Sequence, residues 1–505
     1  MGETQDYLHR IGTVAEFTER YWGEWYHEPW VSRVDEDGDV EYNRRIDRDA
    51  LRLEVESAGT LYWKVSGNTS LGLSRTVSYS LNGGPWVDVT SSPNPATGIP
   101  LGAGDVIVFK GDNASYAFSG ETSGDRVWNC FSGSMGLKFR AAGNVMSLID
   151  SVNFRKLRDF TADFALMGLF RGCPHLTDVS GLVLPATGLT LGCYAYMFCG
   201  CGNLEGMTPY LPAVRMARSC YRSMWQGCVR LTSADIPEMP EGKVLDEKCF
   251  SNMFNGCTRL TDTVTLSETS LAPSCYAQMY EGCSSLTGVT ALPATRVPEA
   301  VYYRMFANCA ALLRAPELPA TSLAHDCYQD MFKGCSGLLD GPSELPATVL
   351  PMQCYNHMFE DCVSLTGIPS VLRIERTLTG VAPGETDENG HHALQMFKGC
   401  VSLTGTPLIL MGEFPMEGAS NTFNTCFSGC SSLREVRVNF IPNGNGQPSG
   451  FTNNWIAGAA EYGTLWLPKS LESGWSDTNR GHGTIPADKD PDTGDYKWNV
   501  DFYND

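Results

Sequence analysis

Apolar residues recur at a fixed spacing in the middle of the chain, and this spacing predicts short helices. Cys275, Met279, Cys283 and Leu286 fall at positions i, i+4, i+8 and i+11. Residues at this spacing lie on one face of a helix that continues into the following turn. The next segment, 289–292, is short, apolar and followed by a proline, so it predicts a brief strand. One unit is therefore predicted to be helix, turn, short strand and turn.

Nearly the same unit recurs ten times. A methionine (Leu169 in the first unit and Cys426 in the last) and an aromatic residue are followed, after two further residues, by an anchoring cysteine. These cysteines are Cys173, Cys201, Cys228, Cys257, Cys283, Cys309, Cys335, Cys362, Cys400 and Cys430. A period of this size predicts a solenoid whose units bury their apolar faces on one another. The expected fold class is thus an α/β repeat solenoid of about ten repeats over 171–440, with short helices and short parallel strands.

The repeated phrases resemble a known family. Met-Phe-x-Gly-Cys-x-x-Leu-Thr and Leu-Pro-Ala-Thr-x-Leu-x-x-x-Cys-Tyr are similar to the BspA-like leucine-rich repeats of anaerobic gut bacteria and their phages. The resemblance covers about 160 to 440 strongly and the flanks more faintly. It implies a leucine-rich-repeat-like fold and an interaction protein of a cell surface or a virion. It implies no catalytic residue.

The regions outside the repeats follow other patterns. Residues 1–45 place five aromatics within one stretch of ten residues, which predicts an arm whose aromatics are covered by the same chain or by a larger assembly. Over 46–140 a period of two and an Asn-Gly-Gly turn at 82–84 predict a small antiparallel β-sandwich. Residues 141–170 are expected to link and cap the first repeat, and 441–505 to cap the last.

The nineteen cysteines are better explained by packing than by bonding. Six repeats hold two cysteines eight residues apart, and on one helix these would be ~12 Å apart. That exceeds the roughly 7 Å limit between the Cα atoms of a disulfide. A disulfide between neighbouring repeats and a zinc site are the alternatives. Val301 and His392 replace a cysteine without breaking the register, which favours buried, apolar thiols.

Composition and charge disfavour several classes of function. The formal net charge of −20 and the lack of a basic run disfavour nucleic-acid binding. No apolar stretch approaches the ~20 residues that span a bilayer. The N-terminal residues lack the pattern of an export signal. No catalytic motif is present among the scattered histidines and serines, so the chain is not expected to be an enzyme.

Variable polar positions, which are expected to be exposed on the predicted helices, are the expected contact residues. They comprise positions within the repeats and a loop at 373–392, where the period stretches to 38 residues. Such a loop is typical of recognition, although neutral surface variation is the alternative. The candidates are Arg222, Gln226, Gln278, Glu281, Gln329, Lys333, Asn356, Glu360, Glu385 and Asp387.

One acidic cluster near the C-terminus is a candidate calcium site. Asp488, Asp490 and Asp492 alternate as the first ligands of a calcium loop do. The following glycine, however, comes one position late, and Asn499 stands where a bidentate glutamate is expected. A solvated acidic turn is the alternative, and no other cofactor is indicated.

These patterns favour a non-enzymatic recognition protein. The leading hypothesis is a phage virion component, such as a tail or fibre protein, that binds a protein or glycan of the host bacterial surface through the solenoid. The arm would then contact other virion proteins, and a homo-oligomer is compatible with this setting. The alternative is a bacterial cell-surface adhesin of the same repeat type, expressed without its export signal.

Overall fold

The computed structural model describes residues 49 to 504 with ten gaps. The predicted arm at 1–45 and the predicted contact residues Glu385 and Asp387 lie outside the described residues, so they stay predictions. The gaps are 96–97, 121–124, 206–208, 233–241, 290, 378–391, 413–420, 443–449, 477–479 and 481–484.

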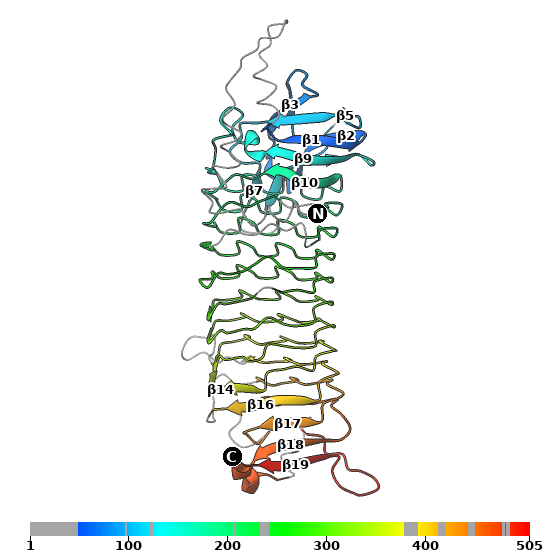
Figure 1. Cartoon of the computed structure of the whole chain (residues 1–505), viewed down its shortest axis with the longest axis vertical. Coiled ribbons are helices and arrows are strands. Elements are labelled where there is room, and N and C mark those ends of the chain that lie inside the picture. Colours follow the sequence, from blue (N-terminus) through cyan, green and yellow to red (C-terminus); the bar gives the residue numbers. More distant parts are fainter. Residues whose placement is uncertain are drawn as a thin grey trace, which may run out of the picture.

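Two β-sheets precede the repeats (Figure 1). One has the strand order β10-β9-β1-β6-β3-β4 and the other β5-β2-β8-β7, and all pairs are antiparallel except β9 with β10. The elements are β1 (Arg52–Ser57), β2 (Gly59–Gly67), η1 (Thr69–Leu71), β3 (Thr76–Leu81), β4 (Val87–Thr90), β5 (Ile99–Leu101), β6 (Val106–Lys110), β7 (Ala117–Ser119), β8 (Arg126–Gly133), β9 (Lys138–Asn144), η2 (Val145–Leu148) and β10 (Leu176–Val183).

The predicted hairpin at 82–84 is confirmed. It joins β3 to β4, which pair antiparallel from Tyr79–Val87 to Thr76–Thr90. Asn82 and Gly83 have φ of 52° and 74°, the left-handed values of a turn whose twist matches that of the two strands. The local sequence therefore specified this turn.

The predicted helices are wrong. Over the described residues of the repeats, no α-helix is present, and each repeat contains a run of consecutive tight turns instead. In the run around Met279, every fourth residue is left-handed: Ser274, Gln278 and Gly282 have φ of 54°, 57° and 75°. The apolar spacing of four residues fits such turns as well as it fits a helix, so periodicity could not separate the two.

Backbone hydrogen bonds explain why turns replace helices. The N–H of Met279 donates to the carbonyl of Tyr276, three residues back, at 3.1 Å. The N–H of Tyr280 instead crosses to the carbonyl of Met305 in the next repeat at 3.0 Å. An α-helix would use such N–H groups internally. Because the two kinds of hydrogen bond alternate along the chain, half of the N–H groups of a turn run bind the repeat to its neighbour.

Short parallel strands connect the turns. Between repeats, β11 (Arg296–Val297) pairs with β12 (Ser322–Leu323), and β13 (Val349–Leu350) pairs with β15 (Arg376–Thr377). The predicted strand at 289–292 does not form in its described residues. The expected parallel pairing is thus present, but in shorter pieces and at other positions.

A longer parallel sheet closes the C-terminal end (Figure 1). Pro407 lies inside β16, where the register with β17 shifts between Gly405 and Leu408, because proline has no N–H for a regular ladder. The sheet has the order β14-β16-β17-β18-β19, with β14 (Val371–Ile374), β16 (Gly405–Met411), β17 (Glu435–Val438), β18 (Gly463–Pro468), η4 (Lys469–Gly474) and β19 (Trp498–Tyr503).

Two columns of stacked aromatic rings run through the repeats, which lie as parallel layers in Figure 1. Neighbouring rings of the first column are 5.3 to 6.1 Å apart and within 14° of parallel. The first aromatic column comprises Phe170, Phe198, Trp225, Phe254, Tyr280, Phe306, Phe332, Phe359, Phe397 and Phe427. The second aromatic column comprises Tyr194, Tyr221, Phe250, Tyr276, Tyr302, Tyr328 and Tyr355.

The repeats extend beyond the segment that the sequence pattern marks. At the N-terminal end, Phe131 of β8 stacks on Phe170 at 5.3 Å and donates its N–H to Leu169, so the preceding sheets continue the core. At the C-terminal end, residues 450–458 form another turn run with left-handed Gly450, Asn454 and Gly458. This copy has neither methionine nor cysteine, which is why the motif missed it. No helix in the described part of the chain has the length and apolar character needed to cross a membrane.

Candidate functional site

Polar side chains line one corner of the turn runs and form a ladder along the repeats. They occupy the positions five and two residues before the anchoring cysteine. The first of these positions is left-handed, as at Gln278, Arg304 and His357. We define this polar ladder as Asn252, Asn255, Gln278, Glu281, Arg304, Asp330, Lys333, His357, Glu360, Gln395 and Lys398.

The first half of the polar ladder centres on Glu281. Asn255 Nδ2 donates to Glu281 Oε2 at 3.2 Å, and Gln278 Nε2 donates to the same oxygen at 2.7 Å. From the next repeat, the Arg304 guanidinium donates to Glu281 Oε1 through Nε at 3.1 Å and Nη2 at 2.6 Å. Glu281 therefore joins three consecutive repeats through charge-assisted hydrogen bonds.

The second half centres on Glu360. Its Oε2 accepts from Lys333 Nζ at 2.5 Å and lies 2.7 Å from His357 Nδ1, while Oε1 accepts from Lys398 Nζ at 2.9 Å. Only 7% of the Glu360 side chain is exposed. Burial by itself raises the pKa of this carboxyl, but the hydrogen bonds from Lys333, Lys398 and His357 outweigh it and lower the pKa to about 2. The carboxylate is thus charged at neutral pH.

The two halves meet at Asp330. Its Oδ1 lies 3.8 Å from Arg304 Nη1 and 3.6 Å from Lys333 Nζ. Charges of opposite sign consequently alternate from Glu281 to Lys398. This arrangement orders long side chains along the repeats before any partner is bound.

The contact residues predicted within the repeats are less exposed than expected. Arg222, Gln226, Gln278, Glu281, Gln329 and Lys333 are half-buried, and Asn356 and Glu360 are buried. The expectation of exposure rested on a helix with a free outer face. In the stack, the next repeat instead covers part of this surface, as when Asn356 Oδ1 accepts the N–H of Leu394 at 3.0 Å.

Sequence reasoning found part of the polar ladder. It named Gln278, Glu281, Lys333 and Glu360 as separate candidates, and the structure brings Gln278 to Glu281 and Lys333 to Glu360. Arg304, Asp330 and Lys398 were not among the candidates. An alignment of the repeats on their anchoring cysteines would have found all three, because they occupy the same two positions.

Three members of the polar ladder have the geometry of a metal site. Ligand atoms of Asp330, His357 and Glu360 lie within 4.8 Å of one another. The ammonium groups of Lys333 and Lys398 already contact this cluster and neutralise Glu360. A cation would have to compete with two lysines, so the cluster is an ion-pair network.

The cysteine thiols make hydrogen bonds as well as apolar contacts. All nineteen are free thiols, and eighteen of them are buried. Burial raises their pKa, for example that of Cys257 to about 12, so they are protonated at neutral pH. Anchoring thiols also donate to the carbonyl of the first aromatic column in the preceding repeat, as Cys283 Sγ does to Phe254 O at 3.1 Å. The packing interpretation had omitted this hydrogen bond.

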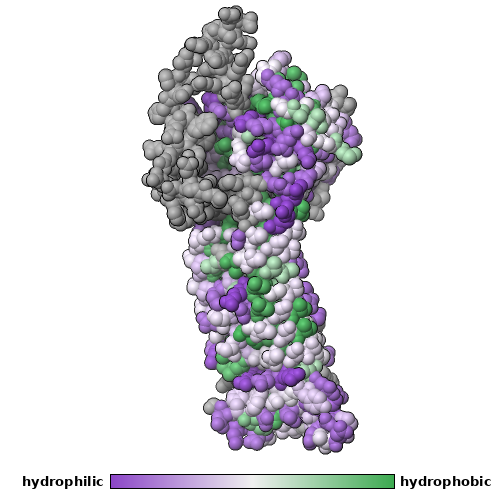
Figure 2. Space-filling model, turned by 45° about the vertical axis from the view of Figure 1, so that its right-hand side comes forward, coloured by the Kyte–Doolittle hydropathy of each residue, from purple (hydrophilic) through white to green (hydrophobic). Residues whose placement is uncertain are grey.

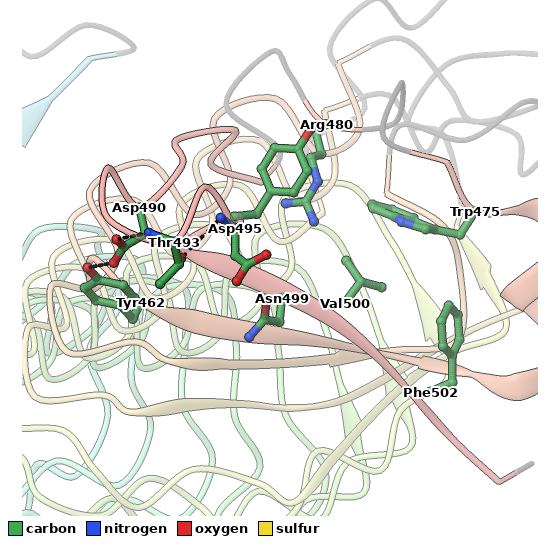
Figure 3. Close-up of a pocket in the computed structure, with 10 residues that line it drawn as sticks. Tyr462, Trp475, Arg480, Asp490, Thr493, Asp495, Asn499, Val500 and Phe502 are labelled. Atoms are coloured by element: carbon green, nitrogen blue, oxygen red, sulfur yellow. Dashed lines mark hydrogen bonds between the residues drawn. The ribbon is translucent and has the colours of Figure 1, made fainter.

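The candidate calcium residues lie in an exposed turn beside β19. Asp490 Oδ1 accepts the N–H groups of Asp492 at 2.9 Å and Thr493 at 3.2 Å. Its Oδ2 accepts the hydroxyl of Tyr462 at 2.9 Å (Figure 3). Both carboxylate oxygens thus stabilise the turn. Calcium binding by Asp488, Asp490 and Asp492 stays a prediction.

Comparisons with known proteins give limited similarity. No family model and no curated protein matches the chain. A leucine-rich cell surface protein from Faecalibacterium prausnitzii is 16% identical over 65% of this chain and 80% of that chain, with a TM-score of 0.30. A leucine-rich repeat protein from Bacteroides ovatus is 16% identical over 67% of this chain and 86% of that chain, with a TM-score of 0.26. At these TM-scores, neither similarity carries an argument about this chain.

Proposed function

We propose that this chain is a non-enzymatic recognition protein whose repeats form a solenoid that presents the polar ladder and its borders to a partner. The observation that carries the proposal is the ordering of charged side chains across consecutive repeats, from Glu281 to Lys398. Binding to pre-ordered side chains costs less conformational entropy than binding to free ones. The nineteen thiols are protonated and all but Cys199 are buried, which favours binding over catalysis by cysteine.

The surface of the repeats is chemically mixed. Figure 2 shows hydrophobic and hydrophilic side chains next to one another along the stack. Exposed apolar residues of the repeats include Leu313 and Leu339. A mixed surface suits a protein or a glycan better than a uniformly charged polymer.

Two exposed side chains mark the border of the polar ladder. Asn308 and Asp361 stand directly before an anchoring cysteine, where most repeats have glycine. Their φ values are 62° and 61°, a conformation that glycine adopts without strain. The fold does not require these side chains, so their removal tests recognition without harming the backbone.

The test is binding of the purified, labelled chain to a panel of intact gut bacteria, measured by flow cytometry. We expect at least one strain to bind, and the double variant Asn308→Gly, Asp361→Gly to bind at least fivefold more weakly with an unchanged melting temperature. The control is Glu344→Gln, an exposed position elsewhere on the repeats. Absence of binding to every strain, or equal binding by the double variant, would overturn the proposal.

The proposed setting is a phage virion that contacts the host surface, with a bacterial cell surface as the alternative. The sequence resemblance is compatible with both. Immunogold electron microscopy with an antibody against this chain separates them. Gold on tails or fibres of particles supports the virion, whereas gold on the bacterial envelope supports the adhesin.

A further inference from the structure

A pocket of about 490 Å³ opens at the C-terminal end of the stack, away from the polar ladder. It is lined by the residue after η4, the acidic turn at 490–496 and the edge strand β19, together with Tyr462 and Arg480. Figure 3 shows Trp475 and Phe502 at one end and Tyr462 at the other. The volume lies in the range of pockets that enclose small molecules, roughly 300–1,000 Å³.

The aromatic part of the pocket is held in place. The Arg480 guanidinium lies 3.9 Å from the ring centroid of Tyr496 and 5.9 Å from that of Trp475. Arg480 Nη1 also donates to the carbonyl of Trp498 at 3.0 Å. The cation fixes both rings. Lys489 Nζ also lies 4.6 Å from the ring centroid of Tyr496, so Trp475 is the ring left to a ligand.

The polar part of the pocket has unused hydrogen-bonding capacity. Asp495 and Asn499 are exposed, and in Figure 3 their side chains point into the pocket between Tyr462 and Trp475. Neither side chain has a hydrogen-bond partner among the described residues. Asp490, in contrast, uses Oδ1 within its own turn and Oδ2 to accept the hydroxyl of Tyr462. The pocket therefore offers a carboxylate and an amide beside aromatic rings.

We infer that this pocket binds a neutral saccharide, with Asp495 and Asn499 accepting and donating hydrogen bonds to adjacent hydroxyl groups of a terminal hexose. The apolar face of a sugar ring packs on an aromatic ring, which Trp475 supplies. A carboxylate and an amide together match hydroxyls that both donate and accept. An anionic ligand would meet the carboxylates of Asp490 and Asp495. A purely apolar ligand would leave Asp495 and Asn499 desolvated without partners.

This inference goes beyond the proposed recognition by the repeats and does not depend on it. The two are tested with different residues. If cell binding is retained by variants of the pocket but lost by the double variant Asn308→Gly, Asp361→Gly, the result supports recognition by the repeats alone. The reverse result supports only the pocket.

The experiment probes the full chain on a printed panel of neutral mono- and oligosaccharides with terminal hexoses, followed by saturation-transfer NMR with the methyl hexoside of the best binder. We expect at least one terminal hexose to bind. Asp495→Asn and Asn499→Ala should each weaken that binding at least tenfold, because each removes a partner of a sugar hydroxyl. Since both side chains are exposed, both variants should melt like the parent chain.

The matched control is Asp501→Asn, an exposed carboxylate on the same strand that does not line the pocket. Its saccharide binding should equal that of the parent chain, with or without EDTA. No binding on the panel, or binding that Asp495→Asn and Asn499→Ala leave unchanged, would overturn the inference. Binding abolished by EDTA would also overturn it, because a metal would then hold the sugar.

Discussion

At the scale of single residues, the anchoring cysteines connect one repeat to the next. The carbonyl of Phe254 accepts the N–H of Cys257 at 3.0 Å and the thiol of Cys283 at 3.1 Å. The same bond recurs along the stack, for example from Cys335 to Phe306 and from Cys362 to Phe332. Cys275, the second cysteine of the same repeat, differs, because among the described residues its thiol donates no hydrogen bond to a neighbouring repeat.

This difference predicts unequal effects of serine at the two positions. Cys275→Ser buries a hydroxyl without a partner in a neighbouring repeat and should lower the free energy of unfolding by about 1–3 kcal/mol. Cys283→Ser retains a donor near Phe254 O and should cost clearly less. Urea unfolding followed by circular dichroism measures both. Equal losses would show that the thiol hydrogen bond contributes nothing specific.

Left-handed positions give a second residue-scale prediction. Gly282 has a φ of 75°, and an added Cβ would meet only Gly256 at 3.7 Å, an ordinary contact. Gly282→Ala should therefore destabilise the chain by about 1–2 kcal/mol through backbone strain alone. Ala300 has a φ of 52°, so Ala300→Gly should relieve strain and raise the melting temperature slightly. Shifts of the same sign in both variants would contradict this explanation.

At the scale of the repeat, side chains and backbone both join neighbours. Each turn run sends alternate N–H groups to the next repeat, and the polar ladder adds ion pairs at one corner. Two lysines, Lys333 and Lys398, and His357 all contact Glu360. Removing its carboxylate leaves Lys398 without this partner and Lys333 with Asp330, 3.6 Å away.

The low pKa of Glu360 predicts acid sensitivity. A carboxyl whose pKa falls from 4.5 to about 2 on folding stabilises the fold above pH 4.5, and this contribution is lost as the pH falls towards 2. Glu360→Gln should therefore lower the free energy of unfolding by on the order of 2 kcal/mol at pH 7. Between pH 4.5 and 2, this variant should lose less stability than the parent chain loses. Unfolding at several pH values measures this difference.

The control for this prediction is Glu435→Gln. The Glu435 side chain is 52% exposed and pairs only with Arg437 on its own strand at 3.2 Å. Exposed pairs contribute little to stability. A pH dependence altered equally by both substitutions would mean that overall charge, and not the Glu360 network, governs acid sensitivity.

At the scale of the whole molecule, the two ends of an aromatic column must be covered by other parts of the chain. The first aromatic column continues into the N-terminal sheets through Phe131 and ends where Trp455 packs edge-on against Phe427 at 6.3 Å. An edge-on ring cannot support another parallel ring above it. Trp455 is fully buried, so the turn run at 450–458 terminates the stack.

Trp455→Ala should expose this end of the stack and lower the free energy of unfolding by about 3–5 kcal/mol. Because each repeat contacts mainly its neighbours, the loss should be local. Hydrogen exchange should accelerate in the last repeats, around Cys400 and Cys430, and stay unchanged near Cys201. Trp86→Ala, at a ring that is 38% exposed beneath Lys110, is the control and should have little effect. Uniformly faster exchange would show that the stack unfolds as one unit.

The candidate site shows which of its features could be predicted from the sequence. The repeat register identified Gln278, Glu281, Lys333 and Glu360 as variable polar positions, but their exposure was misjudged. Exposure depends on what the next layer places against a side chain, and Arg304 is 23 residues away from its partner Glu281. The pocket beside β19 was missed for the same reason, since Trp475 and Asn499 converge only after folding.

The sequence by itself determined the period, the register and the buried residues, because these depend on the spacing of apolar side chains along one chain. Only the tertiary structure decided between helices and turns. Both place every fourth residue on one side, and they differ in whether the N–H of a residue such as Tyr280 bonds within its own segment or to the next repeat. That choice depends on a neighbour, so no local pattern contains it.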